Sequence, residues 1–157
     1  MFSDIDILNH IRSGDIIIEP LDMNRIEPNS YDISLKDGFV DVRGNIINNT
    51  RVIGPREFVL GTSVERVSVS DRVSAILHTR SSIGRMGIGI HATAGLVDAG
   101  FDGHITFEIT NFNDFEIEIP RVPVGQLTFH KLETPSEIPY DGVYNGQVEP
   151  RISIYIS

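Results

Sequence analysis

The chain has 157 residues, a formal net charge of −9 at pH 7 and no cysteine. Its length suits a single domain, residues 1–157, and the acidic balance argues against general nucleic-acid binding, which needs a basic surface to displace counterions. With no cysteine, no signal-peptide pattern and no apolar run near the roughly 20 residues of a membrane span, we expect a cytoplasmic protein without disulfides, cysteine-ligated zinc or membrane contact.

A short helix is predicted at the N-terminus. Ile5, Leu8 and Ile11 recur at helical spacing after Ser3, whose hydroxyl suits the N-cap position. Gly14 then ends the helix, because glycine readily adopts the left-handed conformation of a C-cap.

The rest of the chain reads as short strands separated by turns. Alternating apolar and polar residues, bounded by glycine, proline and asparagine, predict strands at residues 16–20, 31–35, 39–42, 56–60, 64–69, 73–77, 103–110, 115–119, 125–130 and 151–157. Many short strands behind one helix indicate an all-β sandwich or barrel.

Residues 80–87 form a dense group of donors suited to phosphate. Two arginines and two serines fall within six residues, and Gly84 and Gly87 allow the backbone to approach a ligand closely. Guanidinium groups and hydroxyls both donate to phosphate oxygens. On this stretch alone, a surface loop whose arginines pair with acidic residues is an equally good interpretation.

Glu108 is the candidate acid–base group. In the strand predicted at residues 103–110, Ile105, Phe107 and Ile109 share one face, and Glu108 points to the other. A glutamate there can simply be solvated, or it can line a pocket and transfer protons. Asp98 also has two interpretations, as a turn residue or as an acceptor for a sugar hydroxyl or a water.

The absence of two motifs narrows the range of reactions expected of this chain. The chain has no Gly-x-x-x-x-Gly-Lys-Ser/Thr phosphate loop, and its five histidines lack metal-ligand spacing. Because zinc nucleobase deaminases need cysteine ligands, any deamination by this chain would rely on protein acid–base groups.

These motifs, in this order, resemble the dCTP deaminase family, including its bifunctional deaminase–diphosphatase members, within the trimeric dUTPase superfamily. The resemblance is carried by residues 3–7 with Glu19-Pro20, Pro28-Asn29-Ser30-Tyr31-Asp32, the Arg-Ser-Ser-x-x-Arg motif at 80–85, Thr93-Ala94-Gly95, Asp98 to Phe101, Ile105 to Glu108, Val124 to Leu127, and Tyr140 with Tyr144-Asn145-Gly146-Gln147. Residues 36–75 match little.

The resemblance implies a role for each matching residue. Glu108 would activate water for attack at C4 of cytosine, Ser81 and the Ala94 carbonyl would position that water, and Arg85 would stabilise developing charge. Arg80 and Ser82 would hold phosphates, Asp98 the deoxyribose, and Thr106 the base and sugar. The implied substrate contacts are Arg80, Ser81, Ser82, Ile83, Gly84, Arg85, Asp98, Thr106, Phe107, Glu108, Gln126, Tyr140 and Gln147.

The resemblance also implies an architecture. It predicts a distorted β-sandwich, jelly-roll-like or β-clip, that forms a homotrimer with sites between subunits. Residues 136–157 would be a C-terminal lid and closing strand in which Tyr140 and Gln147 cover the triphosphate. Mg²⁺ would bind with the nucleotide, and no zinc or direct protein ligand to a metal is expected.

Three functions are compatible with these residues. The first is deamination of dCTP to dUTP and ammonia, with continuation to dUMP and diphosphate left open. The second is a dUTP diphosphatase without deaminase activity, and the third is a non-catalytic nucleotide-binding regulatory trimer. Gly95 resembles the bifunctional members, whereas Val143 replaces the usual lid lysine and Leu96 stands where relatives often have an aromatic residue or arginine.

Overall fold

A computed structural model describes residues 1–48 and 50–156 of the chain. Its elements run in the order α1 (Asp4–Ser13), β1 (Ile16–Glu19), η1 (Met23–Arg25), β2 (Ile26–Glu27), β3 (Ser30–Ile33), β4 (Phe39–Val40), β5 (Ile46–Asn48), β6 (Val52–Ile53), β7 (Phe58–Val69), β8 (Val73–Thr79), α2 (Ser81–Gly84), β9 (Ile88–Gly89), β10 (Leu96–Val97), β11 (Asp102–Asn111), β12 (Ile117–Glu118) and β13 (Gly125–Lys131). None of the described helices is long and apolar enough to span a membrane.

The predicted N-terminal helix is confirmed. The Ser3 side chain accepts from the Asp6 N–H, and the Asp6 carboxylate accepts from the Ser3 N–H, which completes a capping box. Gly14 ends α1 in the left-handed conformation, with φ of 82°. The helix buries Ile7 and packs along β1.

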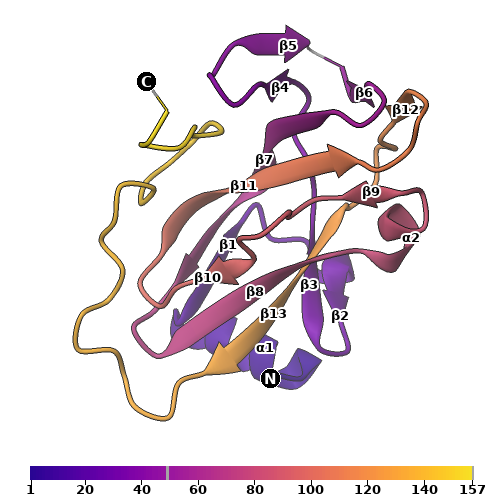
Figure 1. Cartoon of the computed structure of the whole chain (residues 1–157). Coiled ribbons are helices and arrows are strands. Elements are labelled where there is room, and N and C mark those ends of the chain that lie inside the picture. Colours follow the sequence, from indigo (N-terminus) through magenta and orange to yellow (C-terminus); the bar gives the residue numbers. More distant parts are fainter. Residues whose placement is uncertain (49, 157) are drawn as a thin grey trace.

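Two main sheets form the predicted β-sandwich (Figure 1). One sheet has the order β5-β4-β7-β11-β9, with β1 paired to the second half of β7, and the other has the order β10-β8-β13-β3-β2. A small third pair joins β12 to β6. Side chains from both main sheets meet in one continuous core that includes Tyr31, Phe107 and Phe129, all fully buried.

Residues 56–60 and 64–69 were predicted as two strands, which is wrong. Residues 58–60 and 64–69 belong to the single long strand β7, which contains Gly61, whereas Arg56 and Glu57 precede it. A Cβ on Gly61 would lie 2.7 Å from Leu35 Cδ1 and 3.1 Å from Ile109 Cδ1. The glycine therefore serves close packing in the core and does not make a turn.

Strand β11 follows the predicted alternation, with Ile105, Phe107 and Ile109 buried in the core. Its pairing with β7 is irregular between His104 and Thr106. There the Ile105 N–H donates to Ser63 Oγ at 2.8 Å, so the β-bulge leaves this buried donor satisfied.

The strand predicted at residues 151–157 is wrong for the described residues 151–156, and Ser157 lies outside the described residues. This segment is irregular, and Ile154 and Ile156 are exposed. None of the strand pairings among the described residues involves this segment. Figure 1 shows this segment, in yellow, passing outside both main sheets.

Candidate active site

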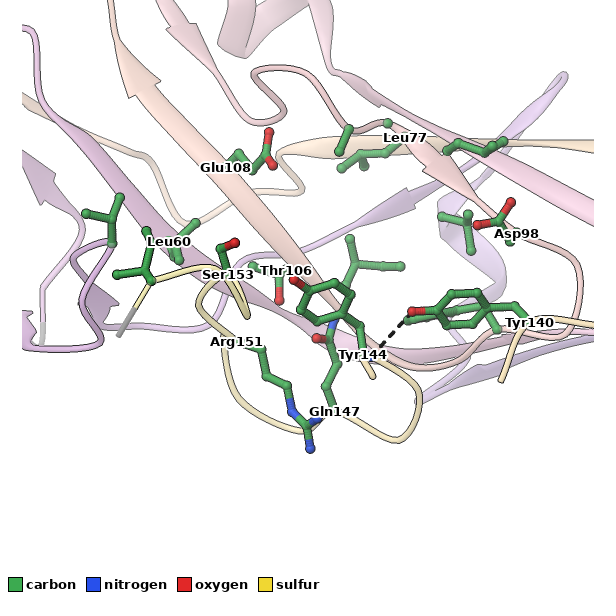
Figure 2. Close-up of a pocket in the computed structure, with 18 of the residues that line it drawn as sticks. Leu60, Leu77, Asp98, Thr106, Glu108, Tyr140, Tyr144, Gln147, Arg151 and Ser153 are labelled. Carbon is green, nitrogen blue, oxygen red and sulfur yellow. Dashed lines mark hydrogen bonds between the residues drawn. The ribbon is translucent and has the colours of Figure 1, made fainter. Parts of the chain in front are cut away.

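A cavity of about 630 Å³ lies between β11, the β10 region and the C-terminal segment (Figure 2). Glu108 lies on one side of it, and Tyr144, Gln147 and Arg151 lie on the other. The wall is largely apolar, with a few polar groups, as is usual for small-molecule sites. Its lining residues are Val42, Phe58, Leu60, Leu77, Ala94, Gly95, Leu96, Val97, Asp98, Phe101, Ile105, Thr106, Glu108, Tyr140, Tyr144, Gln147, Arg151, Ser153 and Ile156.

The Glu108 carboxylate is held by one of its two oxygens. Oε2 accepts from the backbone N–H groups of Ala92 and Thr93 at 3.1 and 3.0 Å, and the Thr93 hydroxyl lies 3.4 Å away. Oε1 has no hydrogen-bond partner within residues 1–48 and 50–156. The predicted outward orientation of Glu108 is confirmed, and its second oxygen remains free to exchange a proton with a ligand or water in the cavity.

Gly100 allows the C-terminal segment to cross the turn that carries Asp98. Its φ is +95°, and a Cβ there would lie 2.6 Å from Pro139 Cβ and 2.7 Å from the Tyr140 nitrogen. Tyr140 donates its N–H to the Ala99 carbonyl at 2.8 Å. Because of this crossing, the exposed Asp98 and the half-buried Tyr140 share one end of the cavity.

Gln147 is fixed to the first part of β11. It exchanges two hydrogen bonds with His104, from its side-chain amide to the His104 carbonyl at 2.7 Å and from the His104 N–H to its own carbonyl at 2.9 Å. Gln147 Oε1 and the nearby Thr106 Oγ1 are buried without a partner among the described residues. Unpaired buried polar atoms are uncommon, and these two belong to residues that line the cavity.

Arg151 is a cavity residue that the sequence analysis missed. It is the one arginine or lysine among the described lining residues, and its Nη1 donates to the carbonyl of Val143. It has no carboxylate partner in the described part of the chain. Val143 stands where the lid lysine is expected, so a search of the following residues for another cation would have found Arg151.

The donors of residues 80–87 do not line this cavity. Residues 81–84 form the short helix α2, not the predicted irregular loop, and Ile83 is its buried anchor. The side chains of Ser81, Ser82 and Arg85 are exposed and have no partner among the described residues. In Figure 1, α2 lies on the side of the molecule away from the C-terminal segment.

Arg80 differs from its neighbours because it is held by a buried carboxylate. Its Nε lies 3.0 Å from Asp32 Oδ2, and its N–H donates to the Val124 carbonyl at 2.9 Å. Burial raises the pKa of Asp32, while the Arg80 guanidinium and the Gln126 amide oppose that rise. Oδ1 of Asp32 is buried without a partner among the described residues.

The structure thus divides the predicted site residues into two groups. Those that line the cavity are Ala94, Asp98, Thr106, Glu108, Tyr140 and Gln147. Those that lie outside it are Arg80, Ser81, Ser82, Ile83, Gly84, Arg85, Phe107 and Gln126. Phe107 is fully buried in the core on the opposite face of β11.

Comparisons with known proteins agree on one family. A family model described as dCTP deaminase-like matches residues 1–132. The dCTP deaminase of Halorubrum lacusprofundi is 36% identical over 171 residues, which cover 93% of this chain and 84% of that protein. A dUMP-forming dCTP deaminase of Sulfurihydrogenibium sp. is 38% identical over 167 residues, which cover 94% and 92%.

Two solved structures show the same fold at lower identity. The 2'-deoxycytidine 5'-triphosphate deaminase from Agrobacterium tumefaciens superposes with a TM-score of 0.65 at 19% identity, over 82% of this chain and 47% of that longer chain. The dUTPase of EIAV superposes with a TM-score of 0.56 at 18% identity, over 82% and 96%.

Proposed function

The chain belongs to the dCTP deaminase-like family, and from this we propose that it hydrolyses dCTP to dUTP and ammonia and then dUTP to dUMP and diphosphate. Relatives at 35–38% identity that match most of the chain include proteins named dCTP deaminase and others named dUMP-forming. Both reactions need an oriented water and a carboxylate that moves its proton.

The single observation that carries the proposal is the position of Glu108. One oxygen is tied to two backbone N–H groups, so the carboxylate keeps its direction, and the residue lines the cavity while its other oxygen has no partner among the described residues. In the deamination, Glu108 removes a proton from water as the water oxygen bonds to C4 of cytosine. It passes this proton to N3, then takes the proton of the new C4 hydroxyl and delivers it to the exocyclic nitrogen, so that C4=O forms, the C4–N bond breaks and ammonia leaves. The Ala94 carbonyl, in the same cavity wall, would accept from that water.

We assign the remaining catalytic groups to a neighbouring subunit of a homotrimer. This assignment is supported by the separation, within one chain, of the carboxylate from the phosphate-type donors. The cavity holds the carboxylate, whereas the exposed donors of Ser81, Ser82 and Arg85 have no partner of their own and lie outside it. In the assembled site, Ser81 would hold the water, Arg85 would stabilise charge developing on the base, and Ser82 with Arg80 would bind phosphate.

The C-terminal segment, residues 136–157, would close over the triphosphate. Support comes from Tyr140, Gln147 and Arg151, which belong to this segment and line the cavity. Arg151 would provide the cation that Val143 does not. No group of three or more His, Asp or Glu residues that could hold a metal occurs among the described residues. We therefore expect Mg²⁺ to arrive on the phosphate oxygens of the substrate.

Product analysis tests this proposal directly. Purified protein is incubated with Mg²⁺ and either dCTP or dUTP, and ammonia, dUTP, dUMP and diphosphate are measured. We expect dCTP to yield ammonia and dUMP. Cleavage of dUTP without release of ammonia from dCTP would identify a dUTP diphosphatase instead. Binding of either nucleotide without any product would identify a regulatory binding protein.

A further inference from the structure

Two asparagines at the end of β11 connect this strand to the turn that carries Arg85. Asn111 is fully buried, and its amide nitrogen donates to the carbonyls of Gly54 and Phe115 at 2.9 and 2.8 Å. Its Oδ1 accepts from both the backbone N–H and the side-chain amide of Asn113, each at 2.9 Å. Asn111 therefore fixes the orientation of Asn113.

Asn113 in turn holds the residue that follows Arg85. Its Nδ2 donates to the Met86 carbonyl at 2.9 Å, and the N–H of Phe112 donates to the Gly87 carbonyl at 2.9 Å. Gly87 has a φ of +74°, and a Cβ there would lie 2.7 Å from both amide atoms of Asn113. This contact requires glycine at position 87, since any larger residue would displace the asparagine amide.

The exposed donors between these anchors have no side-chain support of their own. Arg80 fixes the start of the turn through Asp32 and Val124, and Asn113 fixes its end. Ser81 and Arg85 make no side-chain hydrogen bond or ion pair within the described part of the chain. The direction of their side chains consequently depends on where the backbone is held, by these two anchors and by the buried Ile83 between them.

From this geometry we infer that Asn113 is a positioning residue that aims Ser81 and Arg85 of its own chain into the site of the neighbouring subunit. The inference rests on the shared site proposed above. Asn113 lies on the segment that continues β11, the strand that carries Glu108. It nevertheless acts on the turn, and therefore on the neighbour's Glu108 rather than on its own. A misplacement of about 1 Å in a catalytic group can lower a rate by roughly 100-fold.

Mixed assemblies can show whether Asn113 acts through the turn on the neighbouring subunit's site or acts directly on the Glu108 of its own chain. Arg85→Ala and Glu108→Gln chains, carrying different tags, are co-expressed and purified through both tags. We expect each to be inactive alone, whereas a shared site forms wherever an Arg85→Ala chain supplies Glu108 and a Glu108→Gln chain supplies the turn. Asn113→Ala is then added to one chain type at a time, and kcat and KM for dCTP are measured.

The expected result depends on which of the two chains carries Asn113→Ala. On the Glu108→Gln chain, which supplies the working turn, Asn113→Ala should lower kcat roughly 10- to 100-fold with little change in KM. On the Arg85→Ala chain, whose turn is already inactive, it should change nothing. Gly87→Ala should follow the same pattern, and Asp114→Ala, an exposed change in the same loop, should have no effect in either chain.

Equal losses in both placements would show a general structural role and overturn the inference. A loss confined to the Arg85→Ala chain would show that Asn113 acts on the Glu108 of its own chain, which also overturns it. If the parent mixture regains no activity, the shared site itself is wrong and the inference falls with it. Circular dichroism and light scattering of each mixture confirm folding and assembly.

Discussion

The two walls of the cavity are built in different ways. The wall that carries Glu108 is a central strand whose alternate side chains fill the core, and the carboxylate is held by backbone donors. The opposite wall is the C-terminal segment, which buries little apolar surface: Ile138 is 89% exposed and Val148 is 59% exposed. Polar contacts hold this segment in place, and each is worth only about 1 kcal/mol net.

The difference between the two walls suits two different tasks, proton transfer and the covering of substrate. A proton-transfer group needs a fixed position, which core packing provides, whereas a segment that covers substrate must open and close. Segments with few buried apolar contacts open at low free-energy cost. Changes in the strand wall should therefore act on kcat, and changes in the C-terminal segment should act on KM. The predictions below test that division, beginning with the largest effect.

Glu108→Gln should remove deamination. The glutamine keeps the shape and can still accept from the Ala92 and Thr93 N–H groups, but it cannot take a proton from water. We expect kcat for dCTP to fall by at least about 1000-fold while nucleotide affinity and the melting temperature stay near wild type. Ammonia release, calorimetric binding and thermal unfolding measure these quantities. Glu118→Gln, at an exposed position on β12, is the matched control. Retained turnover would rule out the assigned role.

Gly100→Ala should lift the C-terminal segment off the cavity. The new methyl group would meet Pro139 and the Tyr140 nitrogen, and the left-handed backbone adds strain. We expect KM for dCTP to rise roughly tenfold or more, with a smaller change in kcat. Gly14→Ala has a similar φ but open space around it, so it controls for backbone strain. An unchanged KM would mean that the crossing at Gly100 does not matter for substrate binding.

Arg151→Ala should have a weaker effect of the same kind. The side chain is exposed and belongs to the loosely held wall, so its attraction to phosphate is screened by water. We expect KM to rise roughly three- to tenfold at unchanged kcat. Arg151→Lys should recover part of the loss, and higher salt should reduce the difference between variants. A loss that appears in kcat instead would place Arg151 near the chemistry.

The sequence predicted local features well and long-range contacts poorly. The cap at Ser3, the stop at Gly14 and the outward face of Glu108 depend on neighbouring residues, and each is confirmed. The division of β7 at Gly61 was wrong because the need for glycine comes from Leu35 and Ile109, which are distant in sequence. The strand predicted at residues 151–157 failed because alternation cannot show whether a sheet edge is available.

The same limit applies to the site. The motifs identified Glu108, Asp98 and Gln147, which the fold brings to one cavity. They could not show that Arg80 is held by Asp32, because residues 28–32 read locally as a turn and the start of a strand. The motifs also left out Arg151 and Asn113, whose contacts with Val143 and Met86 are made across folded loops.

The burial of Asp32, which pairs with Arg80, should lower the free energy of unfolding by an amount that depends on pH. This is the smallest effect that we predict. Burial is the main influence on Asp32 and raises its pKa above the ordinary value of 3.8. The folded carboxyl therefore holds its proton more tightly than the unfolded one. As the pH rises from 3.8 through the folded pKa, the Asp32 contribution to the free energy of unfolding falls, and it is constant above that range.

Asp32→Asn removes this titration. The free energy of unfolding of the variant, relative to wild type, should increase with pH across that window and then level off. Urea unfolding at a fixed protein concentration, from just above pH 3.8 to neutral, measures the difference. Asp114→Asn, at an exposed carboxylate, is the matched control. A difference that stays flat or falls with pH would mean that the Arg80 guanidinium fully offsets the burial of Asp32. Asp32 would then hold the Arg80 end of the turn without lowering the free energy of unfolding.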